Sequence, residues 1–250
     1  MTNPWEIKSD DKRTEDSLPT FIIFCEDQIC EPIYFKYFET TKIKVNPIGN
    51  KKSKIENVTN ALCHCRENDL MHNDNGVEFL NAGDIHVWCV FDMDKGAEED
   101  DEANNANFDL AVDGAVAKGF NVAWSNDSFE LWILLHFEDV DVKDDDFKSR
   151  EKYYERLTEI FRNLPNPNEK LSRAKTHASF GYKSDLKRER NFRNIVRPEL
   201  EKRITSAINR ARKIEKVYSD ADQNHHQKSP LTLAHLLVEE LINKGGKEIN

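Results

Sequence analysis

The fold is decided by the stretch IHVWCVFDMD, residues 85–94, in which a run of apolar residues ends in two aspartates. A short, continuous apolar run is typical of a strand that is covered on both faces, as in parallel sheets. The runs FIIFC at 21–25 and FNVAW at 120–124 have the same character. We therefore predict three strongly buried strands.

Segments with helical periodicity alternate with these strands. We predict helices over 31–38, 53–68, 108–116 and 129–137, and a further short strand over 43–48. Alternating strands and helices favour an α/β fold, in which right-handed crossovers bring the carboxyl ends of parallel strands to one edge of the sheet. Ligands of such folds bind at that edge.

The composition predicts three regions along the chain. Residues 1–19 are charged and without apolar periodicity, and we interpret them as a flexible leader. Residues 20–140 form the predicted α/β domain, and residues 141–250 form a helical, partly basic extension in which no strand is expected. The helical patterns of this extension lie at 148–163, 169–178, 193–218 and 231–243.

Length and composition exclude several classes of protein. The 250 residues include 14 Phe and 4 Trp, too many for a disordered chain although 33% of the residues are charged. No apolar stretch is long enough to span a membrane, and the N-terminus is too charged for a signal peptide. We expect a cytoplasmic protein without membrane contact, whose five cysteines are free thiols and not a disulfide framework.

The charge is distributed unevenly. The net charge is -10, yet residues 148–218 contain 20 Lys or Arg against 9 Asp or Glu. A basic face beside an acidic site is suited to holding a polyanion, although solvated amphipathic helices have the same composition. The predicted nucleic-acid contacts are Lys183, Lys187, Arg188, Arg190 and Arg193, with Phe180, Tyr182 and Phe192 as residues on which bases stack.

Three acids follow two of the buried strands. Glu26 comes directly after the first strand, and Asp92 and Asp94 come after the strand at 85–91. All three should meet at one edge of the sheet, where oxygen ligands select hard cations such as Mg²⁺ or Mn²⁺. Acids also follow strands simply because loops are polar, and a DxD sequence alone is weak evidence. Their joint placement strengthens the metal interpretation, because like charges at one edge repel each other without a counterion.

Other polar residues border the same edge. Glu31 either supports the site or favours the positive end of the following helix, and the second role is the commoner one. Asn126 and Glu130 are four residues apart after the strand at 120–124, so both can face this edge from one side of a helix.

Four runs carry a family resemblance: CEDQICEPIYF (25–35), WCVFDMDK (88–95), SNDSFELWILLHF (125–137) and SPLTLAHLLVEEL (229–241). Together they resemble the RloB-like proteins, whose N-terminal part is similar to Toprim domains. The resemblance implies a Toprim-like parallel sheet flanked by helices and a metal-dependent phosphotransfer site at Glu26, Asp92 and Asp94. It also implies a setting in bacterial defence, beside an ATPase or within restriction loci. Asp27 departs from the small residue usual after the first glutamate, and residues 228–232 keep only part of the family's late motif.

Two hypotheses from different classes follow. The first is a Mg²⁺-dependent nuclease that cleaves DNA or RNA as an effector of phage defence. The second is a non-catalytic subunit that binds an ATPase partner through its acidic surface. A topoisomerase-like or primase-like activity ranks below both, because no tyrosine nucleophile domain or zinc-binding primase module is present. Whether the chain forms a homo-oligomer is left open.

Overall fold

A five-stranded sheet lies at the centre of the computed structural model, which describes residues 18–81, 83–94, 102–219 and 222–249. Its strand order is β2-β1-β5-β6-β7, and only the β6-β7 pair is antiparallel. The strands are β1 (Thr20–Cys25), β2 (Lys44–Gly49), β5 (Ile85–Asp92), β6 (Asn121–Asn126) and β7 (Leu231–Thr232). The mostly parallel sheet confirms the predicted α/β class. The predicted leader, except for residues 18 and 19, lies outside the described residues.

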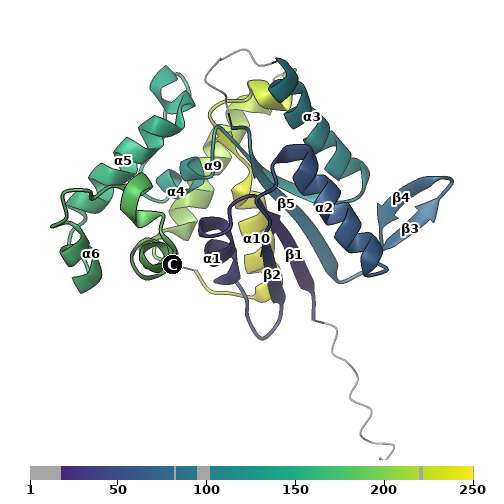
Figure 1. Cartoon of the computed structure of the whole chain (residues 1–250), viewed down its shortest axis with the longest axis horizontal. Coiled ribbons are helices and arrows are strands. Elements are labelled where there is room, and N and C mark those ends of the chain that lie inside the picture. Colours follow the sequence, from purple (N-terminus) through teal and green to yellow (C-terminus); the bar gives the residue numbers. More distant parts are fainter. Residues whose placement is uncertain (1–17, 82, 95–101, 220–221, 250) are drawn as a thin grey trace, which may run out of the picture.

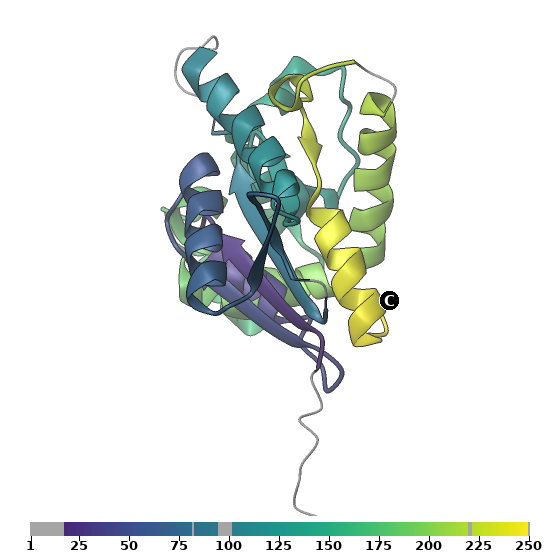
Figure 2. The same cartoon turned by 90° about the vertical axis from the view of Figure 1, so that its right-hand side faces the viewer.

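Helices cover both faces of this sheet (Figure 1). The helices are α1 (Cys30–Lys36), α2 (Lys54–Glu67), α3 (Glu102–Ala117), α4 (Glu130–Leu135), α5 (Arg150–Asn163), α6 (Glu169–Ala174), α7 (Glu189–Asn191), α8 (Arg197–Glu201), α9 (Ile204–Tyr218) and α10 (Ala234–Gly245). Figure 2 shows α2 and α3 on one side of the sheet and α10 on the other. The sheet is therefore covered by helices on both faces.

Strand β5, which contains the apolar run at 85–91, is the middle strand of the sheet, and both of its faces are covered. Phe91 contacts Phe108 of α3, with ring centroids 5.8 Å apart. On the other face the Trp88 indole N–H donates to Glu240 of α10 at 3.2 Å. Burial on both faces explains why this strand is a continuous apolar run instead of an alternating one.

Two expectations about strands were wrong. No strand was predicted between the helix at 53–68 and the strand at 85–91, but a two-stranded antiparallel hairpin lies there, with strands β3 (Met71–Asp74) and β4 (Val77–Leu80). Its turn is Asn75-Gly76, and both residues have positive φ, as a tight hairpin turn requires. The C-terminal region was expected to contain no strand, yet β7 pairs with β6. A two-residue strand is too short to give a periodic signal.

The C-terminal region returns to the sheet instead of forming a separate layer. Core residues from both predicted parts, 20–140 and 141–250, belong to one hydrophobic cluster. The predicted nucleic-acid contacts lie at residues 183–193, between α6 and α8, and we call this stretch the basic segment. Two turns of π-helix, Tyr182–Leu186 and Phe192–Val196, overlap its two ends. All five cysteines are free thiols, as predicted. Among the described residues no helix is long and apolar enough to cross a membrane.

Candidate functional site

Glu26 and Asp92 meet at the carboxyl edge of the sheet. Cys25 of β1 is paired with Val90 of β5, so the residues that follow these strands lie side by side. The Glu26 N–H donates to the Val90 carbonyl at 3.1 Å, and the Asp92 N–H donates to Glu26 Oε2 at 3.1 Å. Two acids 66 residues apart in sequence are thus joined directly.

Asp94 is held by the loop that follows β6. The Met93 N–H donates to the Ser125 carbonyl at 2.8 Å, and the Asp94 N–H lies 3.4 Å from the Asp127 carbonyl. Asn104 of α3 donates to the Asp94 carbonyl at 3.1 Å. Asp94 has a φ of 48°, in the left-handed region that aspartate tolerates better than most residues. In this position its carboxyl group is close enough to Glu26 for its charge to raise the pKa of Glu26.

The crowding of acids changes their protonation. Burial, followed by the charge of Asp94, raises the pKa of Glu26 to about 8. Burial also raises the pKa of Asp92, with further contributions from Glu31 and Glu26. Burial acts in the same direction on Asp94, but the neighbouring Arg150 outweighs it and holds the pKa of Asp94 below its usual value. Raised pKa values of this kind mark a place where negative charge lacks sufficient compensation.

The donor set fits a hard divalent cation in its chemistry. Asp92 Oδ1 is buried and has no hydrogen-bond partner among the described residues, which is costly for a carboxylate oxygen. Glu26, Asp92 and Asp94 supply only oxygen donors, the kind that Mg²⁺ and Mn²⁺ prefer. Across the described ranges no three Asp, Glu, His or Cys side chains form a ready-made ion-binding group. Glu26 and Asp94 instead turn toward protein partners, the Asp92 N–H and Arg150.

A glycine at the end of β2 lets the loop after β1 pass close by. A Cβ atom at Gly49 would lie 2.8 Å from Gln28 Cα and 3.1 Å from the Asp27 carbonyl oxygen. Both are backbone atoms that cannot rotate away. Glu26 is the first residue of this loop, so its position depends on glycine, which has no side chain, at position 49.

Glu31 and Asp27 both stabilise the loop that follows Glu26. Glu31 is 1% exposed, and its Oε2 accepts the Asp27 N–H at 3.2 Å. The Asp27 carboxylate accepts the N–H groups of Ile29 at 2.9 Å and Cys30 at 3.1 Å, at the start of α1. Asp27, the departure from the family pattern, therefore has a local capping role. Burial raises the pKa of Glu31, and the charges of Asp27 and Glu26 add to the shift.

Glu130 forms a buried ion pair with the basic segment. Lys187 Nζ lies 2.6 Å from Glu130 Oε1, and the Glu130 side chain is only 4% exposed. Burial alone would lower the pKa of Lys187, but the Glu130 charge outweighs this and raises it. Asn126, predicted to face the same edge, donates its amide N–H to the His226 carbonyl at 2.6 Å.

Sequence reasoning missed a second pair beside the acids. Arg150, the first residue of α5, donates to Asp127 at 3.0 Å through Nε and at 2.8 Å through Nη2. The same Nη2 also contacts Asp94 Oδ1. Asp127 lies within SNDSFELW (125–132), one of the runs that carry the family resemblance, so the sequence marked it as a candidate site residue. The sequence around Arg150 contains no comparable motif. Lys54 was also missed; its charge partly offsets the rise in the pKa of Glu26.

The basic segment is only partly as predicted. Lys183, Arg188, Arg190 and Arg193 are exposed, but Lys187 is engaged with Glu130. The prediction that Phe180, Tyr182 and Phe192 stack bases was wrong, because they are 6%, 0% and 0% exposed and belong to the core. Aromatic residues interleaved with cations are equally typical of an amphipathic helix with one buried face.

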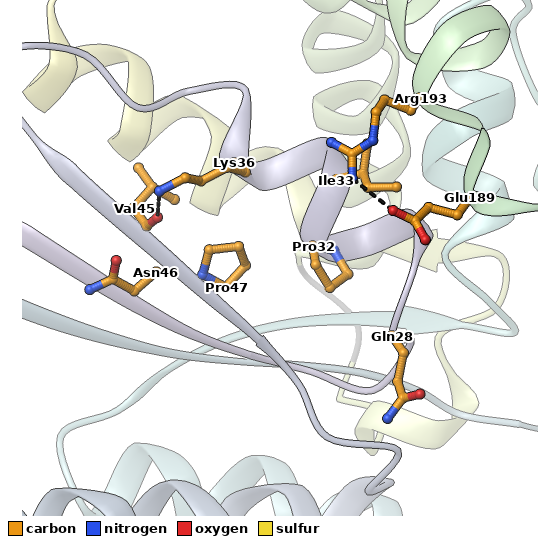
Figure 3. A pocket seen from close by; sticks show the side chains of 9 residues that line it. All are labelled: Gln28, Pro32, Ile33, Lys36, Val45, Asn46, Pro47, Glu189 and Arg193. Atoms are coloured by element: carbon orange, nitrogen blue, oxygen red, sulfur yellow. Dashed lines mark hydrogen bonds and ion pairs between the residues drawn. The ribbon is translucent and has the colours of Figure 1, made fainter. Parts of the chain in front are cut away.

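A groove of about 480 Å³ connects the basic segment with the loop that carries Glu26. Figure 3 shows Arg193 and Glu189 on one side of it, facing Pro32 and Ile33 of α1. Gln28, two residues after Glu26, lines the same groove. The exposed cation Arg193 thus has a continuous surface connection to the loop that follows Glu26.

The chain matches a family model that describes RloB-like proteins over residues 21–241. No match was found among curated proteins or among solved structures. The matched span includes all of the sheet except Thr20, together with the three acids and the basic segment. Because it covers most of the sequence, the chain belongs to the RloB-like protein family.

Proposed function

We propose that this protein is a divalent-metal-dependent nuclease that hydrolyses phosphodiester bonds of DNA or RNA. The observation that carries the proposal is the unpartnered, buried Oδ1 of Asp92 among carboxyl groups whose pKa values are raised. Three oxygen-donating side chains at the carboxyl edge of the sheet, two of which have raised pKa values, provide the ligands that a hard cation requires. Glu26, Asp92 and Asp94 are the residues that would hold Mg²⁺ or Mn²⁺.

The bound metal would polarise a phosphate oxygen and lower the pKa of a water molecule. Glu26 would act as a ligand or a general base in its carboxylate form, which a bound cation would favour over the protonated form that the raised pKa favours near neutral pH. Lys54 moderates the negative charge on Glu26 and Asp94. Gly49, Asn104 and Glu31 keep the loops that carry these acids in place.

The basic segment supports a polyanionic substrate. Arg188, Arg190 and Arg193 are exposed, and the groove lined by Arg193 reaches Gln28, two residues after Glu26. Cations that meet phosphates in this way bind nucleic acid largely through charge. Membership of the RloB-like family fits a cytoplasmic effector of phage defence that works with an ATPase partner.

Cleavage assays test the proposal directly. We expect Mg²⁺-dependent cleavage of labelled single-stranded or double-stranded DNA or RNA by the wild type, and its loss in Asp92→Asn and Glu26→Gln. Glu67→Gln, an exposed acid at the end of α2, is the matched control and should retain activity. Full cleavage by Asp92→Asn would remove the metal-site proposal. If the wild type cleaves none of these substrates but binds an ATPase partner, the non-catalytic subunit is the better account.

A further inference from the structure

We propose that Arg150 contacts the phosphate at the cleavage site and that Asp127 holds it in position. This inference rests on the proposed function and assigns a substrate-binding group to the same site. Its basis is the network in which one guanidinium group joins Asp94, a candidate metal ligand, to Asp127 on the neighbouring loop.

Asp127 fixes the direction of the guanidinium group. Its carboxylate accepts one hydrogen bond from Nε at 3.0 Å and one from Nη2 at 2.8 Å, a planar two-point contact. The Asp127 side chain is 5% exposed, so the anchor is rigid and shielded from solvent. The guanidinium group of an arginine stays charged at any physiological pH.

The other side of the guanidinium group remains available. Nη1 makes no hydrogen bond to any described residue, and the Arg150 side chain as a whole is 26% exposed. Nη1 is not among the buried unpaired polar atoms of the described residues, so it is open to solvent and to a ligand. Because Nη2 already contacts Asp94, a phosphate brought to that carboxylate comes within reach of the unused N–H groups. A fixed cation at this place stabilises charge that develops on phosphate oxygens.

The main rival is that Arg150 only ties α5 to the loop after β6. A structural tie should affect thermal stability, whereas a phosphate contact should affect substrate binding and turnover at unchanged metal affinity. Arg150→Lys separates the two, because it keeps the charge beside Asp127 but loses the planar fork. Arg156→Lys is the matched control, since Arg156 lies on the same helix and forms an analogous two-point contact with Glu138 at 2.9 Å and 2.7 Å.

The experiment combines three measurements on each variant: Mn²⁺ affinity by calorimetry, metal-free affinity for a fluorescein-labelled oligonucleotide by anisotropy, and cleavage. We expect Arg150→Lys to bind Mn²⁺ like the wild type, to bind the oligonucleotide more weakly, and to lose about 100-fold in turnover. Arg156→Lys should match the wild type in all three. If Arg150→Lys is unstable, the double variant Arg150→Gln with Asp127→Asn removes both charges of that pair, although Asp94 also loses its cation, and should show the same losses in oligonucleotide binding and turnover.

Cleavage and oligonucleotide binding by Arg150→Lys equal to those of Arg156→Lys would overturn the assignment. Loss of Mn²⁺ binding in Arg150→Lys would overturn it too, because Arg150 would then act on the metal ligands and not on the phosphate. Failure of the proposed function looks different: the wild type itself would bind no Mn²⁺ and cleave nothing.

Discussion

The backbone N–H of Asp92 donates to Glu26 Oε2 at 3.1 Å, and this contact links the ends of the two central strands at the acids that follow them. The hydrogen bond favours the ionised form of Glu26, yet burial and the charge of Asp94 outweigh it and raise the Glu26 pKa to about 8. The fold thus holds a carboxyl group that binds a proton at neutral pH unless a cation replaces it.

The raised pKa of Glu26 makes the stability of the metal-free protein depend on pH. Between pH 4.5 and about 8 the folded protein retains a proton that the unfolded chain releases, so the free energy of unfolding falls as the pH rises through this window. Above that range the contribution is constant. Thermal unfolding in EDTA should show a smaller decline for Glu26→Gln than for the wild type. Equal declines would mean that Glu26 does not carry the proton.

Loss of the Lys187 charge should destabilise the fold. Lys187→Met leaves the Glu130 carboxylate buried without its partner, at a cost of about 3 kcal/mol in the free energy of unfolding. Adding Glu130→Gln should restore much of this loss, as measured by urea denaturation. Lys183→Met is the control, because its 3.7 Å pair with Glu151 is exposed and should contribute less than about 1 kcal/mol. Equal effects of the two lysine variants would contradict the buried pair.

A side chain at position 49 should displace the loop after Glu26. In Gly49→Ala the new Cβ would lie 2.8 Å from Gln28 Cα, so the backbone must move. A shift of about 1 Å in a reacting group can cost about 100-fold in rate, and we expect cleavage to fall on that scale. Gly114→Ala in α3 meets nothing within 4 Å and should stabilise the protein by about 0.5 to 1 kcal/mol. Unchanged cleavage by Gly49→Ala would show that the loop position is unimportant.

The exposed cations of the basic segment should bind nucleic acid without sequence preference. Arg188→Glu and Arg190→Glu reverse a charge without breaking an ion pair with any described residue, unlike a change at Lys187. We expect weaker binding to every sequence, and a log-log salt slope smaller by nearly one unit for each phosphate that the variant no longer neutralises. A filter-binding titration across salt concentrations measures both. Lys244→Glu, an exposed control on α10, should bind nucleic acid like the wild type. If Arg188→Glu and Arg190→Glu bind as tightly as Lys244→Glu, the basic segment is not the binding surface.

Apolar runs and the residues that directly follow them predicted the buried strands and the position of the acids. The apolar run at 85–91 predicted a strand buried on both faces, and the acids after it were placed at the correct edge of the sheet. The antiparallel strand β7 was not predictable, because its two residues form a strand only by pairing with β6, more than 100 residues earlier. Arg150 was missed for a similar reason: its role arises from an interaction across 56 residues with Asp94.

The prediction that the aromatic residues in and beside the basic segment stack bases was wrong, because composition does not show which way a side chain points. Aromatic residues between cations fit both a base-stacking surface and a helix with one buried face, and only tertiary packing distinguishes them. Tyr182 and Phe192 are fully buried. The exposed cations of the same segment remain the predicted contacts.

The most direct test of the metal site is a crystal of the protein soaked with Mn²⁺ and measured for anomalous scattering. The account predicts a single strong peak within coordination distance of Asp92 Oδ1, with Glu26 and Asp94 turned toward it and away from their present partners. Asp92→Asn crystals soaked in the same way should show no peak there. A wild-type crystal without anomalous density among these three acids, at Mn²⁺ concentrations that support cleavage, would contradict the central claim.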